Sequence, residues 1–317
     1  MGQAEIKATL KNKDFLTLQD FTKEELMYLV ELAISLKDKQ KKGIPHRILE
    51  GKTLAMIFEK SSTRTRVSFE SGMYQLGGHA LFLSKDDLQL GRGEPIKDTA
   101  KVISSYVDGI MMRTFGHEII EEVAKHSAVP VVNGLTNEYH PCQVLADLVT
   151  IYEQLGTFAG KKLTYVGDGN NMTHSLMIGC AIMGMDCSVG VPEGYEVDEQ
   201  IFNIAQTKAA ESGAKIEQVI DPVLAVKDAD IIYTDTWISM GFEEGSEQVE
   251  KVFAPYQVNE SLVKHAKDDY LFFHCLPAYR GKEVTEEIID GPHSVIYDEA
   301  ENRLHAQKAI LASVMDN

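Results

Sequence analysis

Residues 53–73 read TLAMIFEKSSTRTRVSFESGM, and they give the clearest indication of the fold class. The apolar run Leu54–Phe58 has the length and composition of a buried strand, and a helical pattern begins near Arg66. Six polar residues, Ser61–Arg66, separate the two. A buried strand, a polar loop and a helix in this order form the repeating unit of parallel sheets covered by helices.

Apolar runs of strand length alternate with amphipathic segments of helix length along the whole chain. This pattern predicts an α/β fold with two domains, each a parallel sheet flanked by helices. The expected strands of the first sheet are Thr53–Phe58, Ala80–Leu83, Gly109–Arg113 and Val129–Asn133. Those of the second are Leu163–Val166, Cys187–Val191, Lys215–Val219, Ile231–Thr234, Leu271–His274 and Val295–Tyr297. A helix over Pro141–Gln154 and a linker over Gly156–Lys162 place the domain boundary near residue 155.

Composition excludes several classes of protein. The 317 residues are 44% hydrophobic and 25% charged, as expected of a soluble chain with two cores. No apolar run reaches the length of a membrane span, and Met1–Leu10 lacks the apolar core of a signal peptide, so we expect a cytoplasmic protein without a membrane partner. A net charge of −17 also argues against nucleic acid as a partner.

The four cysteines form no Cys-x-x-Cys pair, which argues against a zinc cage and a disulfide framework. Cys275 follows His274 directly, which raises the alternative of a metal site or a Cys–His nucleophile pair. Adjacent residues of an extended chain point in opposite directions, so we expect no metal there.

The polar loop Ser61–Arg66 has the character of an oxyanion site. The first N–H groups of a helix have no partner within the helix, and their partial positive charge adds to that of nearby arginines. A plain helix cap, with Arg64 and Arg66 paired to Glu59 or Glu70, is the simpler interpretation. A cap needs one hydroxyl and no charge, however, so a block of four hydroxyls and two arginines favours phosphate.

Other polar residues follow the expected strands, where ligands collect in open parallel sheets. These residues are Arg113, His140 with Gln143, Asn171, Asp235 and Cys275. Each has a structural alternative, such as a surface ion pair for Arg113 or a packed residue beside a helix cap for His140. The sequence GDGNNM at residues 167–172 is similar to a dinucleotide fingerprint, but Met172 occupies its third glycine position, which argues against a nicotinamide cofactor.

The chain resembles the aspartate and ornithine carbamoyltransferases from Asp14 to Leu311, with five motifs in the expected order. The motifs are KSSTRTR at 60–66, MRT at 112–114, HPCQ at 140–143, DTWISMG at 235–241 and HCLP at 274–277. The resemblance implies a carbamoyl phosphate-binding domain over residues 1–155, an ornithine-binding domain over 156–298, and a C-terminal helix, 299–317, that packs back on the first domain.

The resemblance also implies the site residues. Carbamoyl phosphate would contact Ser62, Thr63, Arg64, Thr65, Gln89, Arg113, His140, Gln143, Cys275, Leu276 and Arg303. Ornithine would contact Asn171, Asp235, Ser239 and Met240. The catalytic set would be Arg64, Arg113, His140, Asp235 and Cys275. In the family, the residue matching Gln89 comes from a neighbouring subunit, which implies a homotrimer or a multiple of trimers.

The Ser239-Met240-Gly241 sequence is typical of the branch of the family that uses L-ornithine, and it implies formation of L-citrulline and phosphate from carbamoyl phosphate without a cofactor. A carbamoyltransferase for another amine, such as putrescine or an acylated ornithine, is the nearest alternative. A non-catalytic phosphate-binding relative and a nicotinamide dehydrogenase are the others. The direction of the reaction in the cell does not follow from these residues, because both directions use the same groups.

Overall fold

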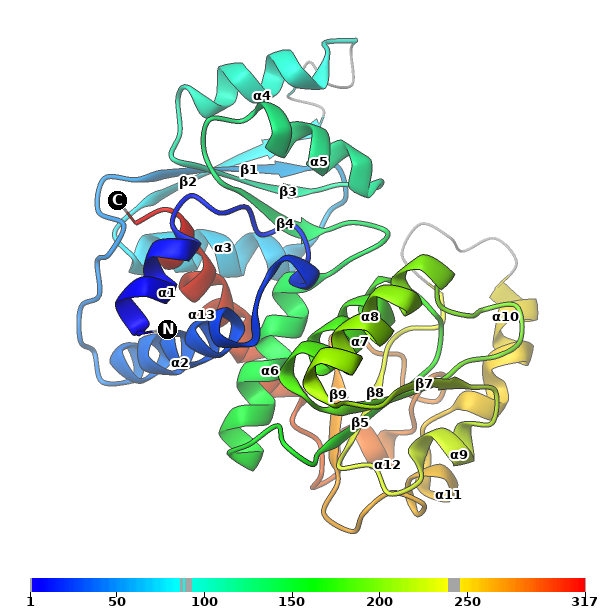
Figure 1. Ribbon diagram of the computed structural model, residues 1–317. Helices are drawn as coiled ribbons and strands as arrows, with labels where there is room; N and C mark the ends of the chain where they lie inside the picture. Colours follow the sequence, from blue (N-terminus) through cyan, green and yellow to red (C-terminus); the bar gives the residue numbers. More distant parts are fainter. Residues whose placement is uncertain (1, 86–87, 89–92, 239–245, 317) are drawn as a thin grey trace. The chain divides into compact units, whose positions relative to one another are not determined.

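The computed structural model describes residues 2–85, 88, 93–238 and 246–316 (Figure 1). The chain divides into two compact units. Unit 1 comprises Met1–Glu153 and Glu301–Asn317, and unit 2 comprises Gln154–Ala300. Two helices run through the boundaries, α6 (Pro141–Leu155) and α13 (Ile296–Val314).

Unit 1 contains a four-stranded parallel sheet in the order β2-β1-β3-β4. The strands are β1 (Thr53–Phe58), β2 (His79–Ser84), β3 (Gly109–Arg113) and β4 (Val131–Leu135). The helices that belong wholly to this unit are α1 (Gln3–Leu10), α2 (Lys23–Lys41), α3 (Thr63–Gln75), α4 (Ile96–Ser104) and α5 (His117–His126).

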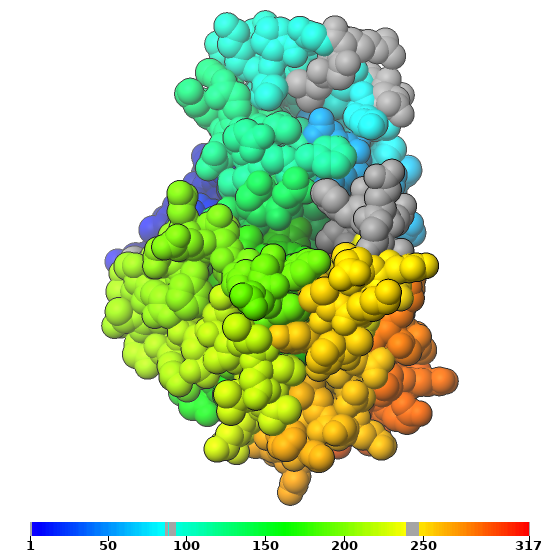
Figure 2. All heavy atoms as spheres, turned by 90° about the vertical axis from the view of Figure 1, so that its right-hand side faces the viewer, coloured from blue at the N-terminus to red at the C-terminus, as the bar shows by residue number. Residues whose placement is uncertain are grey.

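Helices cover both faces of this sheet. Helices α4 and α5 lie on one face, with α3 and the C-terminal part of α13 on the other (Figure 1). Alternate residues of β1 and β3, such as Ile57 and Met112, pack against Ala100 of α4 and Ile120 of α5, because successive side chains of a strand point to opposite faces. Figure 2 shows α4 and α5, in turquoise to green, on the surface of unit 1.

Unit 2 contains a five-stranded parallel sheet in the order β7-β6-β5-β8-β9. The strands are β5 (Lys162–Val166), β6 (Asp186–Gly190), β7 (Ile216–Val219), β8 (Ile231–Thr234) and β9 (Leu271–His274). Helices α7 (Asn171–Met183) and α8 (Glu199–Ser212) cover one face, while α9 (Pro222–Val226) and α12 (Glu286–Ile289) lie on the other (Figure 1). The described part of unit 2 also contains α10 (Ser246–Phe253) and α11 (Glu260–Val263).

The predicted fold class is confirmed: both sheets are parallel and flanked by helices, and α13 packs against helices of unit 1. The expected strand Val295–Tyr297 is wrong. Its neighbour Ser294 makes a single bridge with Phe272, and the carbonyl of Val295 already accepts the N–H of Glu299 (2.9 Å). This bond belongs to the first turn of α13, so the segment turns into a helix after one bridge.

The start of α3 also differs from the sequence prediction. The helix begins at Thr63, three residues before the expected Arg66, because Ser62 caps it. The Oγ of Ser62 accepts the N–H of Thr65 at 3.3 Å. Thr63, Arg64 and Thr65 therefore form the first helical turn, where backbone N–H groups point out of the helix end.

No helix in the described part of the chain is long and apolar enough to cross a membrane.

Candidate functional site

The first turn of α3 gathers hydroxyl and guanidinium groups at the carboxyl edge of the sheet in unit 1. Ser62 Oγ donates to Thr65 Oγ1 at 2.9 Å, and Arg303 Nη2 of α13 donates to the same Thr65 oxygen at 2.9 Å. Thr65 is fully buried and Arg303 is buried. An arginine from the far end of the chain is thus fixed beside the N-terminus of α3, where the helix dipole also favours an anion.

The two arginines of the polar loop have different surroundings. Arg66 donates from Nε to Glu70 Oε1 at 2.9 Å and lies over the ring of Phe82, so the simpler interpretation holds for this residue. Arg64 is half-buried, and its Nε is buried without a hydrogen-bond partner in the described residues. A buried guanidinium nitrogen without a partner is costly unless a ligand supplies an acceptor.

His140 lies in a cationic environment in unit 1. It is 6% exposed and immediately precedes α6. Burial, together with the guanidinium groups of Arg303 and Arg113, holds the pKa of His140 well below its ordinary value. The imidazole is therefore neutral at pH 7 and can donate one hydrogen bond to an oxygen without adding a charge.

Two further residues of the HPCQ motif have defined roles in the fold. Gln143 is fully buried in the first turn of α6, and its Nε2 donates to Asp147 Oδ1 at 2.8 Å, which fixes the orientation of the amide. The Sγ of Cys142 donates to the carbonyl of Asn133 at 3.2 Å. Burial raises the pKa of the Cys142 thiol to about 12, so this cysteine is a packing residue and no nucleophile.

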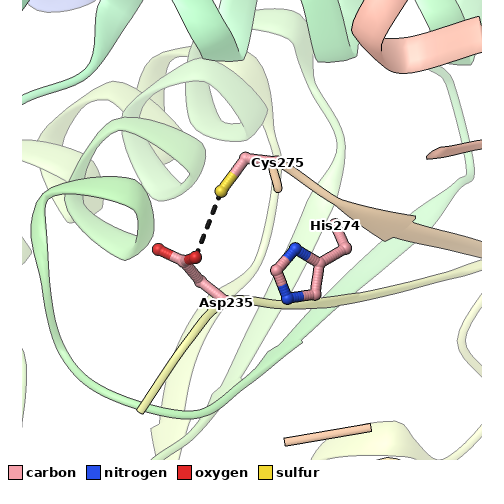
Figure 3. A group of neighbouring side chains, drawn as sticks. All are labelled: Asp235, His274 and Cys275. Atoms are coloured by element: carbon pink, nitrogen blue, oxygen red, sulfur yellow. Dashed lines mark hydrogen bonds between the residues drawn. The ribbon is translucent and has the colours of Figure 1, made fainter. Parts of the chain in front are cut away.

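Asp235 and Cys275 follow the neighbouring parallel strands β8 and β9 in unit 2, and their side chains meet (Figure 3). Cys275 Sγ donates to Asp235 Oδ1 at 3.2 Å, and the same oxygen accepts the N–H of Thr236 at 2.7 Å. Buried Glu299 accepts the N–H of His274 at 2.9 Å and so fixes the end of β9 beside Cys275.

The sequence predicts that the side chains of His274 and Cys275 point in opposite directions and cannot share a metal ion. This geometric argument is wrong. One ligand atom each from Asp235, His274 and Cys275 lie within 4.8 Å of one another. The imidazole nitrogens of His274 already have partners, however. Nδ1 accepts the N–H of Leu276 at 2.9 Å, and Nε2 lies 3.2 Å from Glu283 Oε1, to which it can donate. Metal binding through His274 would break one of these buried bonds.

Asp168 also belongs to this cluster, which its place in the GDGNNM sequence does not predict. Burial, and next the charge of Asp235, raise the pKa of the Asp168 carboxyl to about 6. The same two carboxylates, after burial, raise the pKa of Tyr165 well above its ordinary value. Asp168 and Asp235 follow the paired strands β5 and β8, so strand order could have predicted their proximity.

The remaining predicted residues have less defined surroundings. Asn171 is half-buried at the first position of α7, behind the capping residue Asn170. Leu276 is half-buried and has a positive φ of 58°. Thr63 is exposed in the first turn of α3. Gln89, Ser239 and Met240 lie outside the described residues. The predicted site residues are divided between the two units. Unit 1 contains Arg64, Arg113, His140, Gln143 and Arg303, and unit 2 contains Asn171, Asp235, Cys275 and Leu276.

Comparison with known proteins finds a family model for each of two successive parts of the chain. Residues 13–153 match the family model described as "Aspartate/ornithine carbamoyltransferase, carbamoyl-P binding domain". Residues 159–314 match the model described as "Aspartate/ornithine carbamoyltransferase, Asp/Orn binding domain".

Individual relatives are similar over nearly their whole length. The ornithine carbamoyltransferase of Pyrococcus abyssi is 60% identical over 307 residues, which cover 97% of each chain. The solved structure of the ornithine carbamoyltransferase from Pyrococcus furiosus has a TM-score of 0.94 and 59% identity, covering 96% of this chain and 98% of that one. The ornithine transcarbamoylase of Giardia lamblia has a TM-score of 0.86 and 35% identity, covering 95% and 97%. The chain belongs to the aspartate/ornithine carbamoyltransferase family.

Proposed function

We propose that the chain transfers the carbamoyl group of carbamoyl phosphate to the side-chain amine of L-ornithine, giving L-citrulline and phosphate. The amine attacks the carbonyl carbon, a tetrahedral oxyanion forms, and the bond to the phosphate oxygen breaks. Atoms and charge balance without a redox or metal cofactor. The family membership and the 59–60% identity to named ornithine carbamoyltransferases support this activity.

Unit 1 would bind carbamoyl phosphate. The N–H groups of the first turn of α3, the hydroxyls of Ser62, Thr63 and Thr65, and the guanidinium of Arg64 would hold the phosphate. The observation that carries this assignment is the buried Nε of Arg64, which has no hydrogen-bond partner among the described residues and lies in the same turn that Arg303 joins through Thr65.

The carbonyl oxygen would lie between Arg113 and His140. Donors that are already fixed stabilise a developing oxyanion more than mobile water does, because they need no reorganisation. The lowered pKa of His140 keeps the imidazole neutral, so it can donate to the oxygen without competing with the arginines for the phosphate. The oriented amide of Gln143 would contact the carbamoyl NH₂ group.

Unit 2 would bind ornithine. Asp235 would accept from the α-ammonium, and Asn171, Ser239 and the backbone of Met240 would complete the contacts of the amino-acid head group. Cys275 and Leu276 would lie near the reacting nitrogen. The side-chain amine must lose a proton before it attacks, and with an ordinary pKa near 10.4 this costs about 4 to 5 kcal/mol at neutral pH. Desolvation beside the arginines would lower this cost.

The decisive experiment assays purified protein for carbamoylated product with a panel of amines. We expect citrulline from ornithine and much slower turnover of putrescine or an acylated ornithine. Equal or faster turnover of an amine without an α-carboxylate would contradict ornithine as the substrate. Wild-type protein that binds carbamoyl phosphate without forming citrulline would instead favour a non-catalytic relative.

We also propose a homotrimer in which Gln89 reaches the phosphate of a neighbouring subunit. The proposal rests on the resemblance of the Leu88–Gly91 segment to the family. Light scattering on the purified protein gives the mass of the assembly, and a monomer of 35.3 kDa that is fully active would contradict it. The cytoplasmic location stays a prediction.

A further inference from the structure

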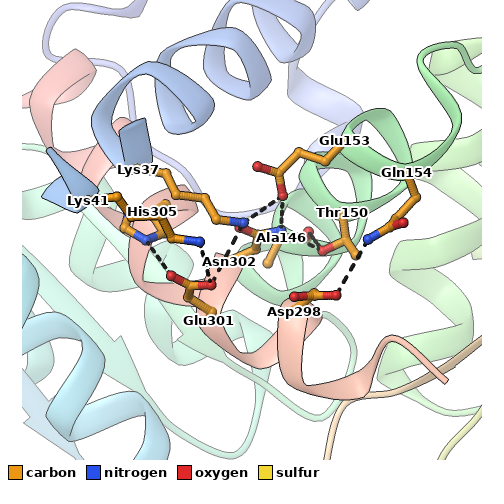
Figure 4. A network of polar contacts seen from close by, with 10 residues as sticks. All are labelled: Lys37, Lys41, Ala146, Thr150, Glu153, Gln154, Asp298, Glu301, Asn302 and His305. Atoms are coloured by element: carbon orange, nitrogen blue, oxygen red, sulfur yellow. Dashed lines mark hydrogen bonds and ion pairs between the residues drawn. The ribbon is translucent and has the colours of Figure 1, made fainter. Parts of the chain in front are cut away.

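A buried polar network holds α13 against α2 and α6 within unit 1 (Figure 4). Its centre is Asn302, which is fully buried and uses both ends of its amide. Asn302 Oδ1 accepts from Lys37 Nζ at 2.8 Å. Asn302 Nδ2 donates to Thr150 Oγ1 at 2.9 Å and to Glu153 Oε2 at 2.8 Å.

The charges of the network balance locally. Lys37 is 7% exposed, and its Nζ donates to Glu153 Oε2 at 2.7 Å. Glu301 of α13 lies 3.9 Å from Lys37 Nζ and 3.3 Å from Lys41 Nζ. Thr150 Oγ1 in turn donates to the carbonyl of Ala146 at 2.9 Å. Because each bond needs its partner at a fixed place, the network has one low-energy arrangement.

This arrangement determines where the next residue of the chain points. Arg303 follows Asn302, and consecutive helical residues project about 100° apart, so a rotation of α13 moves both side chains together. Asn302 faces α2 and α6, whereas Arg303 reaches Thr65 of α3. Farther along α13, buried Lys308 donates to Gln75 Oε1 at 2.8 Å and lies 3.2 Å from His46 Nε2. Polar contacts therefore hold α13 on both sides of Arg303.

Apolar packing alone would fix α13 less well. The hydrophobic effect depends on buried area and has no direction, so a helix can rotate or slide slightly without losing much of it. A hydrogen-bonded buried amide resists such movement, because displacement leaves polar atoms without partners. The same network also contacts α6, the helix that carries Gln143 and follows His140.

We propose that Asn302, held by Lys37, Thr150 and Glu153, is a positioning residue for Arg303. It acts on carbamoyl phosphate through Arg303, and this inference rests on the proposed function of unit 1. Two variants test it. Asn302→Ala removes the centre of the network, and Thr150→Val replaces the hydroxyl that accepts from Asn302 with a methyl group of similar size.

We expect both variants to raise KM for carbamoyl phosphate about tenfold, because each leaves buried polar atoms unpaired and releases Arg303. KM for ornithine should change less than about twofold. Thr150→Ser keeps the hydroxyl and should restore the wild-type KM. In an Arg303→Ala background, Asn302→Ala should have almost no further effect on KM, because the residue through which it acts is gone.

Glu25→Gln is the matched control. Glu25 is also a buried polar residue of α2 in unit 1, where it accepts from Lys13 Nζ at 2.9 Å and from the N–H of Thr22 at 3.0 Å, but the described residues give it no bond to α6 or α13. This variant should lower Tm and leave KM for carbamoyl phosphate unchanged. The inference is wrong if Asn302→Ala and Thr150→Val behave like this control, or if the effects of Asn302→Ala and Arg303→Ala multiply.

The same assay separates this inference from the proposed function. A wild-type chain that forms no citrulline would overturn the proposed function and the positioning role with it. An active wild type in which Arg303→Ala raises KM for carbamoyl phosphate while Asn302→Ala does not would overturn the positioning role alone.

Discussion

The carboxyl edges of the two sheets carry charges of opposite sign. In unit 1, Arg113 and Arg303 lie close enough to His140 to lower its pKa further than burial alone does. In unit 2, the charge of Asp235 adds to burial in raising the pKa of Asp168 to about 6. The chain as a whole has a net charge of −17, so the cationic edge of unit 1 is a local concentration against the overall charge.

Each edge carries groups of like charge, which favour the binding of a substrate group of the opposite charge. Groups of like charge that are held together in a partly buried place cost stability, and a ligand group of opposite charge relieves that cost. An anionic phosphate would do so in unit 1 and an α-ammonium in unit 2.

The largest effect should come from Arg64→Ala in the cationic edge. We expect the loss of the guanidinium beside the phosphate to raise the transition-state free energy by about 4 kcal/mol. This corresponds to a nearly thousandfold fall in kcat/KM. Steady-state citrulline formation measures this loss. Arg66→Ala is the matched control two residues on, since Arg66 is engaged with Glu70 and Phe82. Equal losses in the two variants would refute the assignment of Arg64.

The second effect should come from Asp235→Asn in the anionic edge. The amide keeps an oxygen for the bonds from Thr236 and Cys275 but removes the charge. We expect a fall in kcat/KM for ornithine that corresponds to about 3 kcal/mol of lost transition-state stabilisation. KM for carbamoyl phosphate should change little. Initial rates with each substrate varied in turn measure the two constants. A main effect on carbamoyl phosphate would show that the edges do not divide the substrates as proposed.

The third effect concerns stability. Asp168 has a folded-state pKa of about 6 and an ordinary value of 3.8, so between these values the folded chain binds more protons than the unfolded one. Stability from this group is therefore present at low pH and is lost as pH rises from about 4 to 6. Asp168→Asn should stabilise the protein by about 2 kcal/mol at pH 7.5 and by almost nothing at pH 4.

Denaturant unfolding at the two pH values measures this change. Asp186→Asn serves as control, because Asp186 lies at the opposite edge of the same sheet and accepts the N–H of Lys215 at 2.8 Å. The control should not stabilise the protein. If Asp168→Asn is no more stable than wild type at pH 7.5, burial beside Asp235 does not raise the pKa of Asp168 as described.

The smallest effect concerns His140. Its pKa is lowered in the folded state, so below about pH 6.5 the unfolded chain takes up a proton that the folded chain does not. This group therefore reduces stability as pH falls, by about 1 kcal/mol at pH 5.5. His140→Asn should lack this part of the pH dependence. Unfolding of both proteins at pH 7.5 and 5.5 gives the difference, and an unchanged pH dependence would show that His140 takes up a proton in the folded state.

The pattern of apolar and polar residues is enough to predict the fold class and many residues of the two edges. Apolar runs such as Gly109–Arg113 and Ile231–Thr234 match the observed strands, because buried parallel strands are short and continuously apolar. Polar residues that follow such runs, including Asp235 and Cys275, lie together because strands of a parallel sheet end at the same edge.

Features that depend on contacts between distant parts of the chain do not follow from local sequence. Val295–Tyr297 resembles a strand in composition, yet a single bridge to Phe272 is followed by the first turn of α13. Asp168 is unremarkable in sequence and becomes a strained carboxylate only because folding buries it beside Asp235. Arg303 meets Thr65 across 238 positions of sequence, through a helix that Asn302 holds in place. Local composition specifies strands and helix caps, but burial and long-range hydrogen bonds set the charge and orientation of the groups that face a ligand.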